Sequence, residues 1–510
     1  MPSSAICTAW AKRRASGEST IASLCDRPQP RASVRRVETT DAIDGFGGDR
    51  AGTGDRLTLR RMAPLLPDTP VTSLAAYVEL GGGHGIELAR QLGPEGVIDE
   101  MEISGVRGRG GAGFPAGLKW RSIRSGGDSV GERFVVANAA EGEPATFKDR
   151  WLMRQNPYLP LEGLLIAAHA VGAARAFVAM KASFATEADR MVAALGEMAD
   201  AGWIDDLQID LVLGPDEYLF GEEKGLLEVI EGGDPLPRTL PPYVYGLFTT
   251  GPQIGWSAGP GSADQAANPT LVNNLETLAS VPGIVAEGGE AFRRLGTPES
   301  PGTVLCTVSG DPVHHGVGEF EMGTPLREVI DTVGGGMPDG RSVKYVLSGV
   351  ANPVLADDAL DAAVSYEGFE AAGSGLGAAG FWVFDDRTDP LELAAAVSRF
   401  LSVESCGQCP ACKLGCTAVT DLLQDSLDSD ELDLSVVAAR LSSVDDAARC
   451  YLPTQEQRTV GSLLADLRRP GALVDVVRRD LLVATLVDLD GDRFTLDERH
   501  RRKQPDWTYA

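Results

Sequence analysis

Apolar and polar positions alternate along the first half of the chain in segments of two lengths. Short, nearly continuous apolar runs fit buried strands, and longer stretches with apolar residues every three or four positions fit helices. In chain order these segments are Phe134–Ala137 (strand), Leu161–Val171 (helix), Ala176–Met180 (strand), Ala185–Met198 (helix) and Ile209–Leu213 (strand). This rhythm predicts an α/β domain with a largely buried sheet.

The pattern changes twice further along the chain. Between Gly302 and Leu355, the segments Thr303–Ser309 and Lys344–Leu347 fit strands and Leu326–Val333 fits a helix, which predicts a small α+β module. After residue 389 the periodicity is helical through Leu481. We therefore divide the chain into a disordered N-terminal extension (1–62), an α/β domain (63–298), the α+β module with a connecting segment (299–388), a helical domain (389–480) and a C-terminal tail (481–510).

Charge and composition narrow the classes of function. The net charge is -27 over 510 residues, so the chain offers no basic surface for phosphates and we expect no nucleic-acid partner. The longest apolar stretch, Leu161 to Met180, is interrupted by His169 and Arg175 and fits a buried helix better than a membrane span. The basic, Ser-rich start lacks the apolar segment of a secretory signal, although it loosely resembles an organellar transit peptide.

Five of the eight cysteines fall within one short region. Cys406, Cys409 and Cys412 follow a C-x2-C-x2-C spacing, which wraps three thiolates around one corner of an iron–sulfur cubane while a fourth ligand comes from elsewhere. Cys450 is the better candidate for that ligand, because Cys416 is followed by threonine rather than by the proline of bacterial ferredoxins, and no second motif exists. The cysteines therefore predict electron transfer.

Two other uses of these thiols compete with a cluster. A zinc site usually takes its thiolates from two separated C-x2-4-C pairs, or from one pair with two histidines, whereas this chain has a single triplet with no histidine near it. Disulfides are less favoured still, because a long chain with unevenly scattered cysteines and no export signal is typical of an intracellular protein, where thiols stay reduced.

A glycine-rich loop between residues 104 and 120 is the second candidate for cofactor chemistry. Its Gly108-x-Gly110-x-x-Gly113 satisfies the dinucleotide fingerprint as a string, but that fingerprint needs a strand before it and a helix directly after it. Here a helix-like stretch precedes the loop and Pro115 interrupts it, so a standard Rossmann site is not expected. The loop is either a cradle for a flat ring or a phosphate, with Lys119 as a fixed charge, or a flexible surface loop.

Three polar segments favour the cradle. Residues 138–144 and 218–223 are acidic and follow predicted strands, and residues 268–274 add side-chain amides. The ends of strands are where α/β sheets place their ligands. The alternative is that each segment is an ordinary helix N-terminus, since Glu and Asn suit first turns and caps.

With these motifs the chain resembles the NADH-binding flavoprotein subunit of respiratory complex I and its relatives in soluble hydrogenases and formate dehydrogenases. The match is carried, in the same order along roughly residues 80 to 470, by the glycine loop, Asn138 to Arg150, Tyr218 to Glu223, Pro269 to Leu278 and Glu404 to Cys412. The resemblance implies an FMN-binding α/β domain, a ubiquitin-like β-grasp module of the soluble-ligand-binding type, and an all-α helical bundle that holds one [4Fe–4S] cluster.

The family's functional residues carry over onto positions of this sequence. FMN would be held by Gly108, Arg109, Gly110, Gly111, Gly113, Gly117, Lys119, Asn138, Glu141, Tyr218, Gly221, Asn273 and Asn274. Phe114 and Tyr243 would stack on the nicotinamide dinucleotide, Glu143 would select NADH by repelling a 2′-phosphate, and Glu222 and Glu223 would lie at the rim of the flavin pocket. The cluster would be held by Cys406, Cys409, Cys412 and Cys450.

Three positions depart from the family pattern. Ala140 replaces an aspartate used at the flavin, Arg121-Ser122 stands where a further aromatic helps to sandwich the dinucleotide, and Phe220 replaces a residue that is often a small cysteine. Of these residues, Ala140 and Ser122 favour a rival hypothesis, a relay subunit that has lost nicotinamide binding. A second rival is a non-catalytic scaffold that uses the module at 302–355 to bind a partner or a small ligand.

The resemblance implies that NADH delivers hydride to FMN and that electrons then pass singly to the cluster, without a protein general acid or base. No second cysteine group exists, so electrons would leave to other subunits. The resemblance points to a small thioredoxin-like [2Fe–2S] partner and a larger multi-cluster or catalytic subunit. We expect a cytoplasmic protein, either free or on the cytoplasmic face of a membrane-bound complex.

Overall fold

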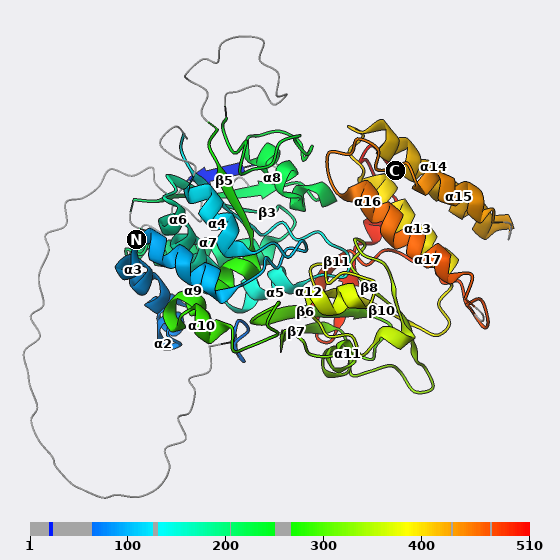
Figure 1. The fold of residues 1–510 in the computed structure, drawn as a ribbon, viewed down its shortest axis with the longest axis horizontal. Coiled ribbons are helices and arrows are strands. Elements are labelled where there is room, and N and C mark those ends of the chain that lie inside the picture. The colour runs from blue at the N-terminus through cyan, green and yellow to red at the C-terminus, as the bar shows by residue number, and fades with distance from the viewer. Residues whose placement is uncertain are drawn as a thin grey trace, which may run out of the picture.

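The computed structural model describes residues 20–23, 64–125, 131–204, 206–249, 267–429, 432–469 and 472–509. They form an α/β unit, a second sheet with its own helices, and a helical unit at the opposite end of the molecule from α2 and α3 (Figure 1). None of the described helices has the length and apolar character needed to cross a bilayer.

The first sheet has the strand order β1-β4-β3-β2-β5. Its strands are β1 (Thr20–Ser23), β2 (Phe134–Asn138), β3 (Arg175–Lys181), β4 (Gln208–Gly214) and β5 (Thr270–Asn274). Strands β2 to β5 run parallel to one another and are mostly buried, which confirms the α/β prediction. Because β5 lies on the other side of β2 from β3, the order reverses at β2, and ligands bind at the carboxyl ends of strands at such a switch point.

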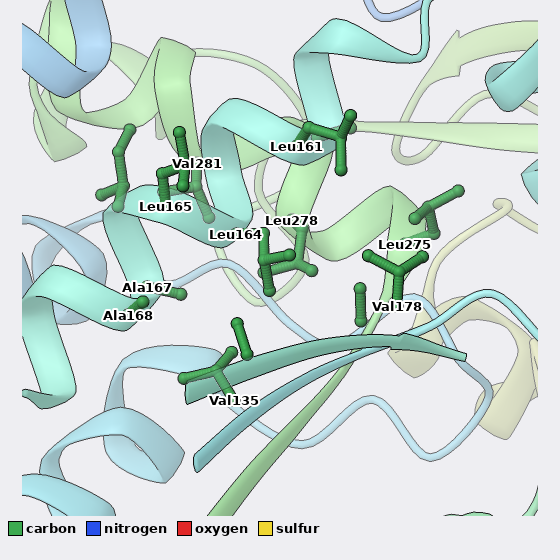
Figure 2. Packing of buried hydrophobic residues seen from close by; sticks show 14 of the residues in the cluster. Val135, Leu161, Leu164, Leu165, Ala167, Ala168, Val178, Leu275, Leu278 and Val281 are labelled. Atoms are coloured by element: carbon green, nitrogen blue, oxygen red, sulfur yellow. The ribbon is translucent and has the colours of Figure 1, made fainter. Parts of the chain in front are cut away.

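Helices cover this sheet and fix its edges. They are α2 (Leu74–Glu79), α3 (His84–Ser104), α4 (Ala116–Arg124), α5 (Lys148–Gln155), α6 (Tyr158–Val171), α7 (Ala185–Asp200), the 3-10 helix η1 (Tyr218–Gly221), α8 (Glu223–Ile230), α9 (Leu275–Glu287) and α10 (Gly289–Phe292). Figure 2 shows side chains of α6 and α9 packed over Val135 and Val178 of the sheet. The two helices can pack closely because Gly163 has no Cβ; a Cβ at this position would lie 1.9 Å from the carbonyl oxygen of Leu278.

The second sheet has the order β7-β6-β10-β8-β9. Its elements are β6 (Thr303–Gly310), β7 (Gly316–Glu321), α11 (Leu326–Gly334), β8 (Val343–Ser348), β9 (Leu355–Ala356), the 3-10 helix η2 (Asp357–Ala359), α12 (Tyr366–Ala371) and β10 (Gly380–Asp385). The central strands β6 and β10 are parallel, and the other pairings are antiparallel. Two of the strands and the helix α11 lie where the sequence predicts an α+β module.

The helical unit is shorter than the sequence pattern suggests. It comprises α13 (Pro390–Glu404), α14 (Pro410–Ser429), α15 (Leu434–Leu441), α16 (Leu452–Gln455), the π-helical turn η3 (Glu456–Val460) and α17 (Gly461–Asp466). The helical prediction through Leu481 is wrong beyond Asp466. The sequence continues with Pro470-Gly471, a pair that disfavours helical hydrogen bonding.

The predicted C-terminal tail is an ordered part of the structure. It contains the hairpin β11 (Leu486–Asp490) and β12 (Arg493–Leu496), followed by the 3-10 helix η4 (Glu498–Arg501). Leu486 and Phe494 are buried in one hydrophobic cluster with residues of α13 and α14, so the tail adds to the core.

Only residues 20–23 of the predicted disordered extension 1–62 lie within the described part. They form strand β1, antiparallel to β4, rather than a disordered segment. Residues 20–23 pair with β4 because β4 would otherwise be an open sheet edge, and because the β-branched residues Thr20 and Ile21 favour a strand. The rest of the extension lies outside the described residues.

Candidate functional site

The carboxyl ends of β2 and β5 meet at the switch point of the first sheet. Asn138 and Asn274 are register partners there. The amide nitrogen of Asn138 donates to the carbonyl oxygen of Gly221 at 2.8 Å, which ties the end of β2 to η1. Two of the three polar segments thus meet the end of β5 at one edge of the sheet.

The glycine loop is closed by its own backbone and bonded to the second-sheet module. A bridge between Arg107 and Pro115 closes it, and the Tyr366 hydroxyl donates to the Gly108 carbonyl at 2.6 Å. At the tip, a Cβ on Gly110 would lie 3.1 Å from the Cβ of Asn274, so the loop reaches the sheet edge. Helix α4 begins just after the loop without a side-chain cap, which leaves first-turn N–H groups suited to a phosphate.

Three of the predicted flavin residues make contacts with the protein scaffold. The guanidinium of Arg109 donates to the carbonyl oxygens of Pro301 and Thr303, at 3.0 and 2.9 Å, and so anchors the loop to β6. The buried Asn273 accepts a hydrogen bond from the Trp120 indole at 2.9 Å. Gly117 allows α4 to pack on α3, because its Cβ would lie 2.6 Å from the Glu102 backbone nitrogen. Their roles toward FMN stay predictions.

Charged residues surround the sheet edge. Lys119 forms an ion pair with Glu223 at 2.8 Å. Glu222 accepts from two backbone N–H groups at the start of α8, and Asn274 accepts from the Glu276 N–H at the start of α9. The helix-cap alternative therefore describes Glu222 and Asn274 correctly, while Asn274 also lies beside Gly110 of the glycine loop and beside the end of β2.

Glu141 and a buried charge cluster lie next to Asn274. Glu141 accepts from the N–H groups of Asp149 and Arg150 at 3.1 and 3.2 Å. Burial, together with the nearby Asp149 carboxylate, raises the pKa of Glu141 to about 7. Buried Lys148 lies 2.9 Å from Asp149 and 2.8 Å from Glu276. No sequence motif marks Lys148 and Asp149, and charged residues of this kind are rarely buried unless they are paired.

Glu143 is bound on both sides by protein groups. Its carboxylate accepts from the Val350 N–H of the second-sheet module at 2.7 Å and from the Tyr218 hydroxyl at 2.5 Å. Gln455 of the helical unit donates to the same hydroxyl at 2.7 Å. Burial raises the pKa of Glu143 above its usual range. Tyr218 and Gln455 therefore lie where the three units meet, and no sequence motif marks Gln455.

The two predicted stacking residues are open to solvent. The exposed fraction is 56% for Phe114 and 54% for Tyr243, unusual values for large apolar rings. Nothing in the described residues covers either ring face enough to prevent a planar ligand from stacking on it.

Ala140, the departure from the family's aspartate, faces a hydrophobic cluster. It is 1% exposed, and its cluster includes Val136 of β2 and Phe220 of η1. A side chain that other apolar side chains enclose in this way is not directed into an open flavin pocket. Ala140 and Phe220, both departures, therefore belong to one packed region.

The four predicted cluster cysteines line one cavity. Cys406, Cys409, Cys412 and Cys450 surround it together with Leu219, Pro237, Ser405, Arg449, Leu452 and Pro453. Burial raises the pKa of the Cys450 thiol to about 12, so this thiol would need a metal to deprotonate it. Four thiols around a common cavity match the number of protein ligands of an iron–sulfur cubane.

Cys416 lies outside that cavity. It is fully buried in α14, one turn after Cys412. A hydrogen bond with Cys416 lowers the pKa of the Cys412 thiol to about 7, which favours the thiolate that a metal ligand must become.

The flavin-side residues and the cysteine cavity share the short helix η1. Tyr218 bonds to Glu143 on one side, and the next residue, Leu219, lines the cysteine cavity. The carbonyl of Gly221 in the same helix accepts from Asn138 at the end of β2, so η1 connects the sheet edge to the cysteine cavity.

Comparisons with known proteins agree with this arrangement. Residues 101–283 match the Nuo51 FMN-binding domain, and residues 392–469 match the NADH-ubiquinone oxidoreductase-F iron-sulfur binding region. The chain is 36% identical to an NADH-quinone oxidoreductase subunit of Rhizobium meliloti (strain 1021), over 68% of this chain and 81% of that protein. It is 32% identical to the NADP-reducing hydrogenase subunit HndC of Solidesulfovibrio fructosivorans, over 74% and 76%.

Solved structures give the same result. The crystal structure of an NAD+-reducing [NiFe]-hydrogenase in the H2-reduced state matches with a TM-score of 0.67 and 30% sequence identity. The match covers 82% of this chain and 68% of the hydrogenase chain.

Proposed function

Because this chain belongs to the family of NADH-quinone oxidoreductase subunits that carry the Nuo51 FMN-binding domain and the iron–sulfur binding region, we propose that it is the electron-input flavoprotein of a larger complex. It oxidises NADH with FMN and passes electrons through a [4Fe–4S] cluster to partner subunits. One observation carries this function: η1 contributes Tyr218 to the flavin side and Leu219 to the cysteine cavity, so both sites lie next to each other in one chain.

The residues at the sheet edge fit FMN. Gly110 leaves room beside Asn274, the first turn of α4 offers N–H groups for the phosphate, and Lys119 supplies a positive charge. Asn138 and Asn274 provide side-chain amides within reach of a flavin ring or ribityl chain. When bound, FMN supplies the ability to accept a hydride and to release electrons one at a time.

The protein groups act by placement. Phe114 and Tyr243 present open ring faces on which the nicotinamide dinucleotide stacks. Glu143 is proposed as the carboxylate that disfavours a 2′-phosphate, through its charge near the adenosine ribose. Cys406, Cys409, Cys412 and Cys450 hold the cluster, and no side chain is required as a general acid or base.

We propose that the second sheet is a ubiquitin-like β-grasp module. Support comes from its order β7-β6-β10-β8-β9, with first and last strands parallel at the centre and helix α11 after the first hairpin. We also propose a thioredoxin-like [2Fe–2S] subunit and a larger multi-cluster or catalytic subunit as partners, in the cytoplasm or on the cytoplasmic face of a membrane-bound complex. The relatives' own names describe subunits of oxidoreductases.

A relay subunit without nicotinamide binding is the second candidate. The observation that favours it is Arg121, which stands with Ser122 in place of an aromatic and is committed to ion pairs with Glu95, Asp99 and Glu102. Anaerobic addition of NADH to the purified flavoprotein separates the two. Bleaching of the flavin absorbance supports the NADH-oxidising function, and a flavin that is bleached by dithionite but not by NADH supports the relay.

A further inference from the structure

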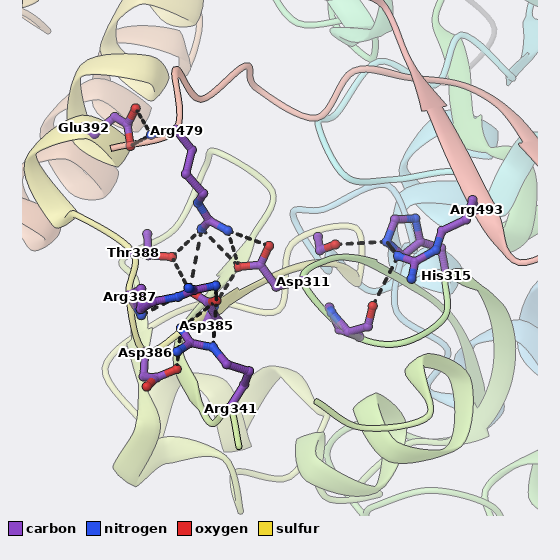
Figure 3. Close-up of polar contacts among 12 residues, drawn as sticks. Asp311, His315, Arg341, Asp385, Asp386, Arg387, Thr388, Glu392, Arg479 and Arg493 are labelled. Carbon is purple, nitrogen blue, oxygen red and sulfur yellow. Dashed lines mark hydrogen bonds and ion pairs between the residues drawn. The ribbon is translucent and has the colours of Figure 1, made fainter. Parts of the chain in front are cut away.

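The C-terminal segment 472–509, here called the strap, contacts all three units of the molecule. It begins beyond residue 469, where the matched iron–sulfur region ends. Near its start, Arg479 pairs with Asp311 of the second-sheet module at 2.9 Å, and its N–H donates to Glu392 of α13 at 2.9 Å (Figure 3). This end of the strap therefore joins the second sheet to the helical unit.

The middle of the strap is bound to the FMN-binding unit. The Ala145 N–H donates to the Ala484 carbonyl at 2.7 Å, and the Arg150 guanidinium donates to the Leu486 carbonyl at 3.2 Å. Leu486 and Phe494 are buried in the cluster that includes α13 and α14. The strap is thus held by both backbone bonds and apolar burial.

The end of the strap converges on Glu404, the last residue of α13. Lys503 lies 2.7 Å and the His500 ring nitrogen 2.9 Å from one Glu404 oxygen, and the other oxygen accepts from the Tyr218 N–H at 3.0 Å. The side chains of Lys503 and Glu404 are only 1% and 2% exposed. A buried carboxylate needs such partners, since removing one from a buried pair is strongly destabilising locally.

Glu404 occupies a position that both redox sites share. Along the chain it directly precedes Ser405 and Cys406, and through its hydrogen bond it fixes the backbone of Tyr218 in η1. Lys413 of α14 adds to this connection, because its ammonium donates to the Ser405 carbonyl at 2.7 Å and to the Pro505 carbonyl of the strap at 2.8 Å.

We propose that Lys503 and His500 of the strap are positioning residues, which act through Glu404 to fix η1 at the flavin site against the cysteine loop 405–409. This inference rests on the proposed function, in which electrons cross from the flavin side of η1 to the thiol side. Electron transfer rates fall steeply with distance, so a loosened η1 slows this step while leaving the nicotinamide surface of Phe114 and Tyr243 unchanged.

The test uses the cofactor-loaded full chain and the variant Lys503→Met, which keeps much of the side-chain volume but removes the charge. Rapid mixing separates bleaching of the flavin from appearance of the reduced-cluster EPR signal. We expect flavin bleaching at the unaltered rate and cluster reduction slower by about tenfold to about a hundredfold. In a parallel experiment the flavin is reduced by light instead of by NADH. This experiment distinguishes a defect in NADH oxidation from slower electron transfer between flavin and cluster.

Amide hydrogen exchange gives a readout that does not depend on electron transfer. Exchange in the peptide that contains Tyr218 should accelerate in Lys503→Met and return to normal in Lys503→Arg. Arg501→Gln is the matched control, because Arg501 lies on the same segment but pairs with Asp480 and Glu498 at the surface. That variant should match the unmodified protein in both readouts.

Two results would overturn the proposal. One is unchanged cluster reduction and unchanged Tyr218 exchange in Lys503→Met. The other is an equal loss in both half-reactions together with loss of cofactors, which indicates a general structural role. If Lys503→Met does not accumulate as folded protein, His500→Gln provides the same comparison, since Lys503 still pairs with Glu404, and an unaltered ratio of the two half-reaction rates counts against the proposal.

Discussion

Ala140→Asp restores the family's aspartate at a position where the structure has no place for it. From sequence alone, a carboxylate at the flavin adds a hydrogen-bond acceptor worth about 1.5–3 kcal/mol, so the substitution should tighten FMN binding. In the structure, however, Ala140 is 1% exposed within an apolar cluster that includes Phe220. We therefore expect the opposite outcome.

The cost can be worked from the surroundings. Burial of a carboxyl group without a hydrogen-bond partner costs about 2–5 kcal/mol even if it is protonated. The extra volume adds about 1–3 kcal/mol of overpacking. Domains are stable by only about 5–15 kcal/mol, so the variant should lose a large part of its stability and release FMN.

Urea unfolding and FMN retention after gel filtration measure both effects. Ala140→Val tests volume alone and should cost about 1–3 kcal/mol. Ala182→Asp, at the exposed position just after β3, should stay within about 0.5 kcal/mol of the original. An Ala140→Asp protein with unchanged stability and tighter FMN would refute the reasoning, because it would mean that residue 140 faces the flavin.

Three further outcomes are expected. Cys450→Ser should alter or abolish the cluster EPR signal while Cys416→Ser should not, because Cys450 lines the cavity and Cys416 does not; the reverse pattern would exclude this ligand set. Glu143→Gln should narrow the preference for NADH over NADPH, mainly by raising kcat/KM for NADPH. An unchanged ratio of kcat/KM for the two dinucleotides would contradict the role of Glu143 in this selection. Burial raises the pKa of Glu456 to about 8, and one of its oxygens has no partner. The stability that protonated Glu456 contributes is therefore full below the unfolded pKa near 4.5 and is lost as pH rises toward 8. The free energy of unfolding in urea should fall by about 3 kcal/mol between about pH 5.5 and 7.5 because of this residue, and Glu456→Gln should abolish that fall. An equal fall in both proteins would contradict this.

The parallel sheet was predictable because β2, β3 and β4 are buried on both faces and read as continuous apolar runs. Strand β7 was not predictable from the sequence, because it lies at a sheet edge and is half-exposed. Its residues, Gly316-Val-Gly-Glu-Phe-Glu, therefore form no apolar run. The sequence pattern does not reveal the C-terminal hairpin, because its strands are short and mostly polar and are stabilised by contacts with distant parts of the chain.

The residues of the candidate site also form two groups, those that the sequence predicts and those that only the structure reveals. Cysteine spacing depends on local ligand geometry, so the grouping of Cys406, Cys409 and Cys412 could be read from the sequence. The direction of the Arg109 side chain could not be read from the sequence, because the carbonyl oxygens that accept its hydrogen bonds are almost two hundred positions away. The same holds for Glu143, whose partners Tyr218 and Val350 come from two other segments of the chain.

The central claim is that electrons from NADH reach the thiol-bound cluster by way of the flavin within this one chain. Rapid freeze-quench EPR after anaerobic mixing with NADH, followed in parallel with flavin absorbance, tests it most directly. We expect flavin bleaching to come first and a reduced-cluster signal to follow as the reduced flavin is reoxidised. This signal should be absent in Cys406→Ser. A flavin that stays oxidised with NADH, or a flavin that is reduced while an intact cluster never is, would contradict it.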